Sequence, residues 1–147
     1  MKLKSINKLP KLYFGYGSNM NHNQMSFRCP TAQFVRPFYL KGWELEFGSH
    51  ATIVPKHGAV VPGALWRLTD SDIAALDRYE GYPVYYSRRR WRQDNEHFFF
   101  YEMQRPIVGS PSMGYVLGIA EGYQQCGIKL DYLTKHVNAP KKYVYTY

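Results

Sequence analysis

The sequence has little cysteine, no long apolar run and no metal-binding spacing. Its two cysteines, Cys29 and Cys126, form no CxxC pair and are too few for a disulfide framework, which predicts free thiols in a reducing compartment. None of the five histidines stands at a ligand spacing from cysteines or carboxylates, so no metal site is expected. No apolar run approaches the roughly 18 residues of a membrane span, and residues 1–11 are basic without the apolar core of a signal peptide. These absences predict a soluble, cytoplasmic protein with no membrane partner.

Acidic residues are also few, since 11 Asp and Glu face 19 Lys and Arg and give a formal net charge of +8. Such a balance favours anionic partners in general, including carboxylates, phosphates and nucleic acid. The 147 residues suit a single domain, and the 14 tyrosines favour strands and pocket walls over helices. We expect one domain over residues 1–147, with a loose lead-in over 1–11 and a C-terminal tail over 138–147.

Strand signals dominate the first two-thirds of the sequence and helix signals the last third. Strands are predicted over 12–14, 32–47 (with a turn or bulge at 41–42), 51–55, 58–68, 85–92 and 97–104, and helices over 20–27, 71–80, 113–125 and 131–137. In the third helix Gly114, Gly118 and Gly122 form a small face that predicts close packing against a sheet. This order indicates an α+β domain, and a closed or nearly closed small barrel would protect both edges of so aromatic a sheet.

A glycine-containing turn follows the first strand, in Tyr16-Gly17-Ser18-Asn19. Gly15 and Gly17 predict positive φ angles or a close approach of a ligand to the backbone. Successive amide groups at residues 17–19, next to a helix start, predict an anion-binding cradle. The alternative is a tight strand-to-helix connection in which Asn19 or Asn21 caps the helix. A dinucleotide fingerprint and a nucleophile elbow are both excluded, because each requires a glycine at the position of Met20.

A single carboxylate, Glu80, stands at the end of the predicted 71–80 helix, just before Gly81. The negative end of the helix dipole disfavours its charge, and neighbouring tyrosines would desolvate it, so we predict a raised pKa. A carboxylate that titrates near neutral pH suits a general acid/base. A solvated surface glutamate is the alternative.

These motifs together resemble those of the γ-glutamylcyclotransferase-like superfamily, which includes the plant AIG2-like proteins. The matching segments are residues 16–19, 28–30, 64–68, 76–81 with Tyr86, and 111–112 with Tyr115. The resemblance implies a small mixed β-barrel with flanking helices and an enzyme that converts a γ-glutamyl amide or amino acid to 5-oxoproline, with no cofactor. It implies binding of the substrate by Tyr16, Gly17, Ser18, Asn19, Tyr86 and Tyr115, and catalysis by Glu80. Tyr85 makes the register of Tyr86 ambiguous. Asn19 replaces the leucine of glutathione-specific and γ-glutamylamine relatives. The arginine run at 88–92 is also more basic than the resemblance requires, which leaves the leaving group open.

Two other functions remain alternatives. The same fold could bind a small anion without turning it over, since fold alone does not confer activity. Less favoured is a nucleic-acid binder that uses the arginines of the 85–92 strand. Alternation places Arg88, Arg90 and Arg92 on the face of Tyr86, so we predict that one of them reaches the pocket and the others are solvated. The sequence leaves the oligomeric state open.

Overall fold

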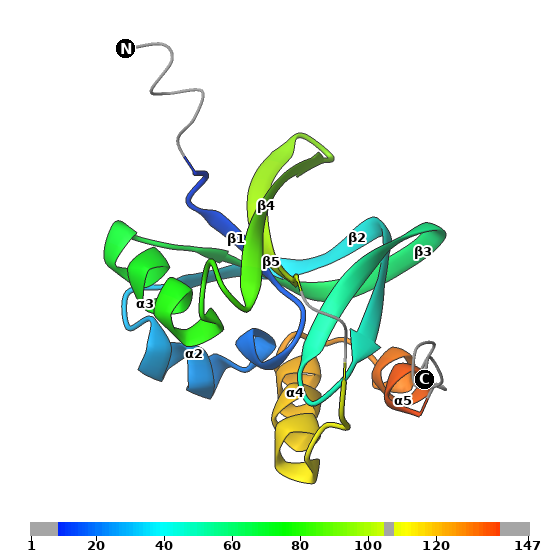
Figure 1. Cartoon of the computed structure of the whole chain (residues 1–147). Coiled ribbons are helices and arrows are strands. Elements are labelled where there is room, and N and C mark those ends of the chain that lie inside the picture. The colour runs from blue at the N-terminus through cyan, green and yellow to red at the C-terminus, as the bar shows by residue number, and fades with distance from the viewer. Residues whose placement is uncertain (1–8, 105–107, 139–147) are drawn as a thin grey trace.

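The computed structural model describes residues 9–104 and 108–138, which form one mixed sheet with helices packed around it (Figure 1). The strands are β1 (Leu12–Gly15), β2 (Gln33–Phe47), β3 (Ala51–Arg67), β4 (Tyr86–Gln93) and β5 (Glu96–Met103). The helices are the 3₁₀ turn η1 (Ser18–Met20), α2 (His22–Arg28), α3 (Asp70–Glu80), α4 (Met113–Gln125) and α5 (Asp131–Val137). The α+β class is therefore confirmed. Most of the predicted lead-in and tail lies outside the described residues.

The sheet has the order β2-β3-β1-β5-β4, and β1 lies at its centre. β1 pairs antiparallel with β3 and parallel with β5, so both of its edges are used. All four of its residues are buried, as expected for a strand covered on both faces. The turn that follows β1 therefore starts from the most fixed strand of the sheet.

The sheet curls toward a barrel, and its two edge strands contact each other through side chains, including the ring pair of Trp43 and Trp91. Gln93 of β4 accepts a hydrogen bond from the Lys41 amide (2.9 Å) and donates to the Tyr39 carbonyl (2.8 Å), both on β2. A side-chain amide thus takes the place of backbone pairing at this seam. The predicted barrel-like architecture is confirmed in this partly open form, in which β2 and β4 are the edges of the five-stranded order.

The two strands predicted over 51–55 and 58–68 are one strand, β3, so that prediction was wrong. Their boundary is a bulge, because Lys41 pairs with Val60 whereas Trp43 pairs with Pro55. Gly42 and Gly58 both have positive φ angles there, +86° and +82°, which glycine adopts without steric cost. The bulge predicted at residues 41–42 is confirmed, and it bends the long β2–β3 hairpin without reversing the chain.

Local signals set the limits of α3. Thr69 and Asp72 form a capping box, with the Asp72 amide 3.2 Å from Thr69 Oγ1 and the Thr69 amide 3.0 Å from Asp72 Oδ2. Gly81 ends the helix with φ +67°, and its amide donates to the Arg78 carbonyl. The predicted 71–80 helix is confirmed, and Glu80 is its last residue.

Helix α4 packs against η1, and this contact differs from the predicted packing of its glycines on a sheet. A Cβ atom at Gly122 would lie 2.7 Å from the Met20 carbonyl carbon, so only glycine permits this approach. A Cβ atom at Gly118 would lie 2.6 Å from Gln24 Nε2, whereas one at Gly114 would meet nothing within 4 Å. The glycine face thus supports the turn after β1 from below, in the view of Figure 1.

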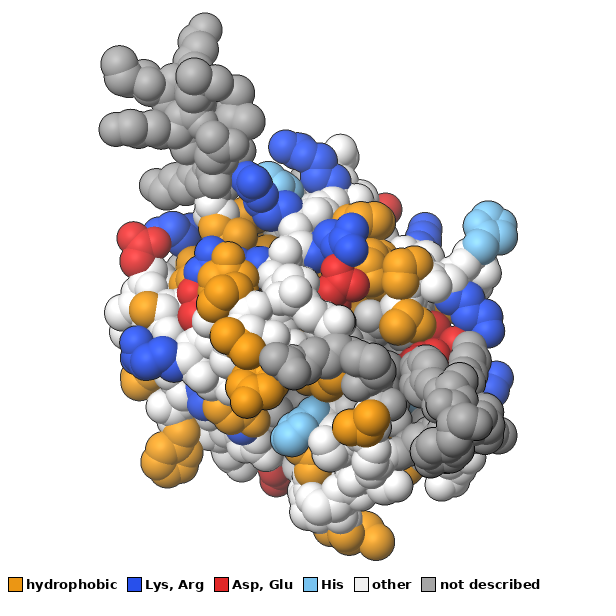
Figure 2. Space-filling model, in the orientation of Figure 1, with side chains coloured by type: hydrophobic (Ala, Val, Ile, Leu, Met, Phe, Trp, Pro, Cys, Tyr) orange, Lys and Arg blue, Asp and Glu red, His pale blue; other side chains and the backbone are white. Residues whose placement is uncertain are grey.

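The surface carries its charge unevenly. Figure 2 shows several lysine and arginine side chains along the upper part of the visible face, around the β4–β5 hairpin, and others at its left and right edges. Within residues 9–104 and 108–138, no helix is both long and apolar enough to span a bilayer.

Candidate active site

A cavity of about 620 Å³ opens where the turn after β1, the end of α3, the start of β4, the tip of the β2–β3 hairpin and α4 meet. Its walls are mostly aromatic, and Glu80 is the carboxylate among its lining residues. The residues that line it are Tyr13, Tyr16, Gly17, Ser18, Asn19, Ser49, His50, Ala51, Arg78, Tyr79, Glu80, Gly81, Tyr85, Tyr86, Met103, Val108 and Tyr115. All seven predicted site residues are in this set, so the structure brings together segments that are up to 99 positions apart.

Glu80 is held in the cavity wall rather than in bulk water. Its side chain is only partly exposed, and burial raises its pKa to about 7, while the positive charge of Arg28 acts in the opposite direction. The pKa direction predicted from the sequence is the one found, with burial as its largest cause. A carboxylate with this pKa exchanges protons readily at neutral pH.

The turn over residues 15–19 is tight, although its glycines do not have the positive φ angles that the sequence suggested. Gly17 has φ −119°, and a Cβ atom at Gly15 would lie 3.0 Å from the Asn19 carbonyl oxygen. Gly15 thus serves close approach, whereas a Cβ at Gly17 would make ordinary contacts inside the cavity, with Ala51 at 3.4 Å and the Tyr115 hydroxyl at 3.5 Å. The positive-φ alternative was wrong because the chain turns through a 3₁₀ geometry.

The amide groups of this turn precede its first internal hydrogen bond, which runs from the Met20 amide to the Gly17 carbonyl (3.0 Å). Amides at the start of a helix have no partner within the helix. Asn21 caps the following helix, because its side chain accepts a hydrogen bond from the Gln24 amide (3.0 Å). The turn is therefore a strand-to-helix connection capped by Asn21, and its residues 17–19 also line the cavity.

Asn19 links the turn to Glu80. Its Nδ2 donates to the Tyr13 hydroxyl (2.8 Å) and lies 3.4 Å from Glu80 Oε2. Its backbone carbonyl accepts from Trp66 Nε1 (2.8 Å), which anchors the residue to β3. Tyr13 was not among the predicted site residues, because a tyrosine in a buried strand looks like an ordinary core residue.

Two tyrosines from opposite sides of the cavity hold the end of the β2–β3 hairpin. The Tyr86 hydroxyl donates to the Ala51 carbonyl (2.7 Å), and the Ala51 amide donates to the Tyr115 hydroxyl (3.0 Å). Tyr86 is buried, whereas Tyr85 is 59% exposed, which places Tyr86 rather than Tyr85 in the inner wall. Tyr16 is buried as well and donates to the Tyr101 carbonyl.

The phenols around Glu80 keep their protons. Burial is the largest cause of the raised pKa of Tyr13, Tyr16, Tyr86 and Tyr115, and proximity to Glu80 raises each of them further. They are therefore neutral hydrogen-bonding groups across the range in which Glu80 titrates. The cavity combines one ionisable carboxylate with a ring of neutral hydroxyls.

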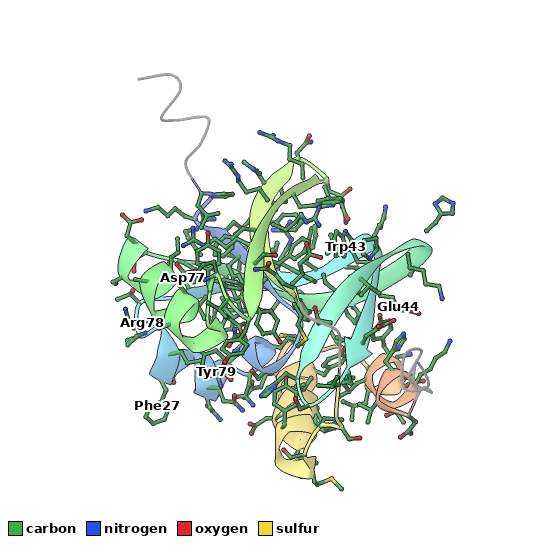
Figure 3. The ribbon with its side chains drawn as sticks, in the orientation of Figure 1. Phe27, Trp43, Glu44, Asp77, Arg78 and Tyr79 are labelled. Atoms are coloured by element: carbon green, nitrogen blue, oxygen red, sulfur yellow. The ribbon has the colours of Figure 1, made fainter. Side chains whose placement is uncertain are left out.

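The arginines of β4 do not enter the cavity, so the prediction that one of them reaches it was wrong. Arg88 instead pairs with Asp77 of α3 through both Nε and Nη2, and its guanidinium lies 4.2 Å from the centre of the Tyr82 ring. Arg90 and Arg92 are exposed. Figure 3 shows Asp77 on the part of α3 that faces β4.

Arg28, the last residue of α2, is the cation that the sequence reasoning left without a role. Its guanidinium contacts the Asn19 side chain and lies 3.7 Å from the centre of the Tyr79 ring. The only signal for it was its position ten residues after the turn. Among the described residues, no group of three or more His, Cys, Asp or Glu side chains is arranged to hold a metal ion.

Comparisons with known proteins agree with this geometry. Residues 13–117 match the family described as gamma-glutamyl cyclotransferase, AIG2-like. A protein of Mus musculus named gamma-glutamylcyclotransferase is 30% identical over 142 residues, covering 84% of this chain and 76% of its own length. The Homo sapiens protein of the same name is 29% identical with the same coverage. A solved structure named gamma-glutamyl cyclotransferase superposes with a TM-score of 0.76 at 27% identity, covering 90% of both chains.

Proposed function

Because this chain belongs to the gamma-glutamyl cyclotransferase, AIG2-like family, we propose that it cyclises a γ-glutamyl amide or γ-glutamyl amino acid to 5-oxoproline. The α-amino nitrogen of the substrate attacks its own γ-carbonyl carbon, which forms the five-membered ring. The bond from that carbon to the leaving nitrogen then breaks, and the amine is released. Both reacting atoms belong to one molecule, so the protein's task is to fold the substrate and to move protons.

Glu80 supplies the proton transfers in this proposal. In its ionised form it accepts the proton that the attacking nitrogen loses, and it returns a proton to the leaving nitrogen. Its position in the cavity wall and its pKa of about 7 are the observation that carries the proposal. A carboxylate with an ordinary pKa would be a weak base toward an amine at neutral pH.

The turn over residues 16–19 binds the α-carboxylate of the γ-glutamyl group in this proposal. Its support is the set of amide groups at the start of η1, together with the space kept open at Gly17. Tyr86 and Tyr115 shape the opposite wall and hold Ala51, and Tyr16 closes the inner end. The reaction as written needs no cofactor, since every proton passes through Glu80.

We propose a cytoplasmic location for the reaction. Cys29 and Cys126 are both free and buried, which fits a reducing compartment.

The test of this function is the Glu80→Gln variant, which keeps the size of the side chain and removes the proton acceptor. We expect release of 5-oxoproline from γ-glutamyl-alanine and related substrates to fall by about 10²–10⁴-fold. Glu96→Gln is the matched control, because Glu96 pairs with Arg36 on the surface and lies outside the cavity.

Wild-type turnover in a folded Glu80→Gln protein would exclude the proposed mechanism. If wild type binds γ-glutamyl compounds but releases no 5-oxoproline, the non-catalytic binding module is the correct function.

A further inference from the structure

Arg28 stands behind the cavity wall and is held from several sides. Its Nη1 donates to Asn19 Oδ1 (2.6 Å) and lies 3.3 Å from Ser18 Oγ, while its Nη2 donates to Gln24 Oε1 (2.7 Å). The guanidinium stacks on Tyr79 at 3.7 Å, so both its edges and one face are in contact. Within the part of the chain that the structure describes, no carboxylate lies within ion-pair distance of Arg28, so its charge is not neutralised by a partner.

This contact fixes which way the Asn19 amide faces. A guanidinium only donates hydrogen bonds, so it selects the carbonyl end of the asparagine side chain. The amide's NH₂ group must then face the other way, toward the Tyr13 hydroxyl and Glu80 Oε2. The reverse orientation would set donors against donors at 2.6 Å. Arg28, Asn19 and Glu80 therefore form a chain with one polarity, running from α2 through the turn to the end of α3.

The buried groups around Glu80 do not carry a competing charge into the cavity wall. Tyr13 of β1, Tyr16 of the turn, Tyr86 of β4 and Tyr115 of α4 are neutral phenols with raised pKa values. Four more titratable residues line the cavity but are exposed, where solvent screens their effect; these are Arg78 and Tyr79 of α3, Tyr85 just before β4 and His50 of the β2–β3 hairpin.

We propose that Arg28 is a positioning residue that acts through Asn19, orienting its amide so that the NH₂ group stabilises the ionised form of Glu80. This inference rests on the proposed role of Glu80 as the base. The 3.4 Å separation shortens as the carboxylate gains charge during proton exchange, because a charged acceptor attracts the amide more strongly. The charge of Arg28 adds to the polarity of that amide, and its influence on the pKa of Glu80 has the expected downward direction.

Loss of Arg28 therefore shifts the acid limb of the plot of kcat/KM against pH to higher pH. An opposite charge near a carboxylate lowers its pKa by about one unit or more, so Arg28→Gln should reduce kcat/KM about tenfold at pH 6. Near pH 9 Glu80 is ionised in both proteins, and the difference should largely vanish. A purely structural role for Arg28 would instead lower activity by the same factor at every pH.

The direct experiment is a titration of the Glu80 carboxyl carbon by NMR in ¹³C-Glu-labelled protein, assigned with Glu80→Gln. We expect the midpoint to rise in Arg28→Gln and in Asn19→Leu, and to stay near the wild-type value in Arg28→Lys. Arg92→Gln removes the same charge from the exposed strand β4 and should leave the midpoint unchanged.

An unchanged midpoint in folded Arg28→Gln, or an equal rise in Arg92→Gln, overturns the proposal. A rise in Arg28→Gln without one in Asn19→Leu overturns the part assigned to Asn19. Should Arg28→Gln not fold, Asn19→Leu decides the outcome, because it interrupts the chain with Arg28 in place. The titration needs no substrate, so it also gives an answer if the protein releases no 5-oxoproline and the proposed function fails.

Discussion

Glu80 carries a cost to stability that comes from the same burial that suits it to proton transfer. Its folded-state pKa is about 7, against a usual value of 4.5, so the folded protein holds this proton more tightly than the unfolded chain does. Below the unfolded value both states are protonated and the group contributes nothing. As pH rises from about 5 to 8, the folded state loses up to about 3 kcal/mol relative to the unfolded state.

This sign predicts an unusual effect of a single substitution. Glu80→Gln should unfold at nearly the same urea concentration as wild type at pH 5, and at a higher one at pH 8, because the amide never has to ionise in the cavity wall. Urea unfolding of both proteins at the two pH values measures the difference. A gap of equal size at pH 5 and pH 8 would show that Glu80 is not desolvated.

For single residues, the sequence predicts that Glu80 is the acidic residue of the site but not which side chains contact it. Glu80 can be found from a helix end and the glycine after it, which are local signals. Asn19 was predicted as a site residue from its own turn, but its contact with Glu80 could not be, because the two residues are 61 positions apart; the same holds for the contact between Ser18 and Tyr79. The role of Arg28 could not be predicted for a related reason, because it depends on which end of the Asn19 side chain the guanidinium contacts.

At the level of elements, the end of α3 is fixed to the sheet by the pair between Asp77 and Arg88. Both side chains are largely shielded, with 19% and 27% of their surface exposed, and Tyr101 also donates to Asp77 Oδ1 (2.6 Å). Charge-assisted hydrogen bonds in such a setting stabilise more than surface pairs do. The last turn of α3 therefore has little freedom to move Glu80 out of the cavity wall.

Arg88→Gln should destabilise the protein by about 1–3 kcal/mol, because it leaves the shielded carboxylate of Asp77 without its cation. Arg92→Gln on the same strand should change stability by less than about 0.5 kcal/mol. Thermal unfolding of both variants and wild type at pH 7 gives the comparison. Equal stabilities for the two variants would mean that the pair does not hold α3.

Helices and strands whose ends are marked by local sequence signals were predictable. Strands whose extent depends on pairing with a distant strand were not. The limits of α3 follow from Thr69 and Gly81, both within the helix's own segment. The single strand β3 could not be distinguished from two strands, because a bulge and a turn at Gly58 have the same composition and differ only in the partner opposite. The contact of Arg88 with Asp77 was not predicted, because alternation along a strand shows only which face of the sheet a side chain is on. Its position relative to α3 depends on the register of β4 with β5, in which Arg88 is opposite Tyr101.

For the whole molecule, the formal net charge is +8, and among the lysines and arginines in the described part of the chain only Arg78 lines the cavity. Figure 2 shows several of the others around the β4–β5 hairpin. Exposed charges of this kind attract polyanions without selecting among them. The net charge therefore bears on non-specific association with polyanions, whereas the specific function is expected to reside in the cavity.

Any affinity for nucleic acid should be weak, independent of sequence and steeply lost between about 50 and 200 mM salt, as counterion release requires. Cyclisation of a γ-glutamyl substrate should survive the same change better, because the partly buried groups of the cavity are screened less. Both quantities can be measured on one preparation, by fluorescence anisotropy and by 5-oxoproline release. Tight, salt-tolerant and sequence-selective binding without any cyclisation would reverse the ranking of the two functions.

The central position of β1 has a consequence for synthesis on the ribosome. β1 is synthesised before the other described strands, and its partners are Phe99 of β5 and the last four residues of β3, Ala64–Arg67. β1 can therefore gain its antiparallel partner once Arg67 has been made, but its parallel partner only once Phe99 has been made, and the cavity wall at Tyr115 comes later still. The edge of β1 that pairs with β5, at Tyr13, thus stays open until Phe99 has been made.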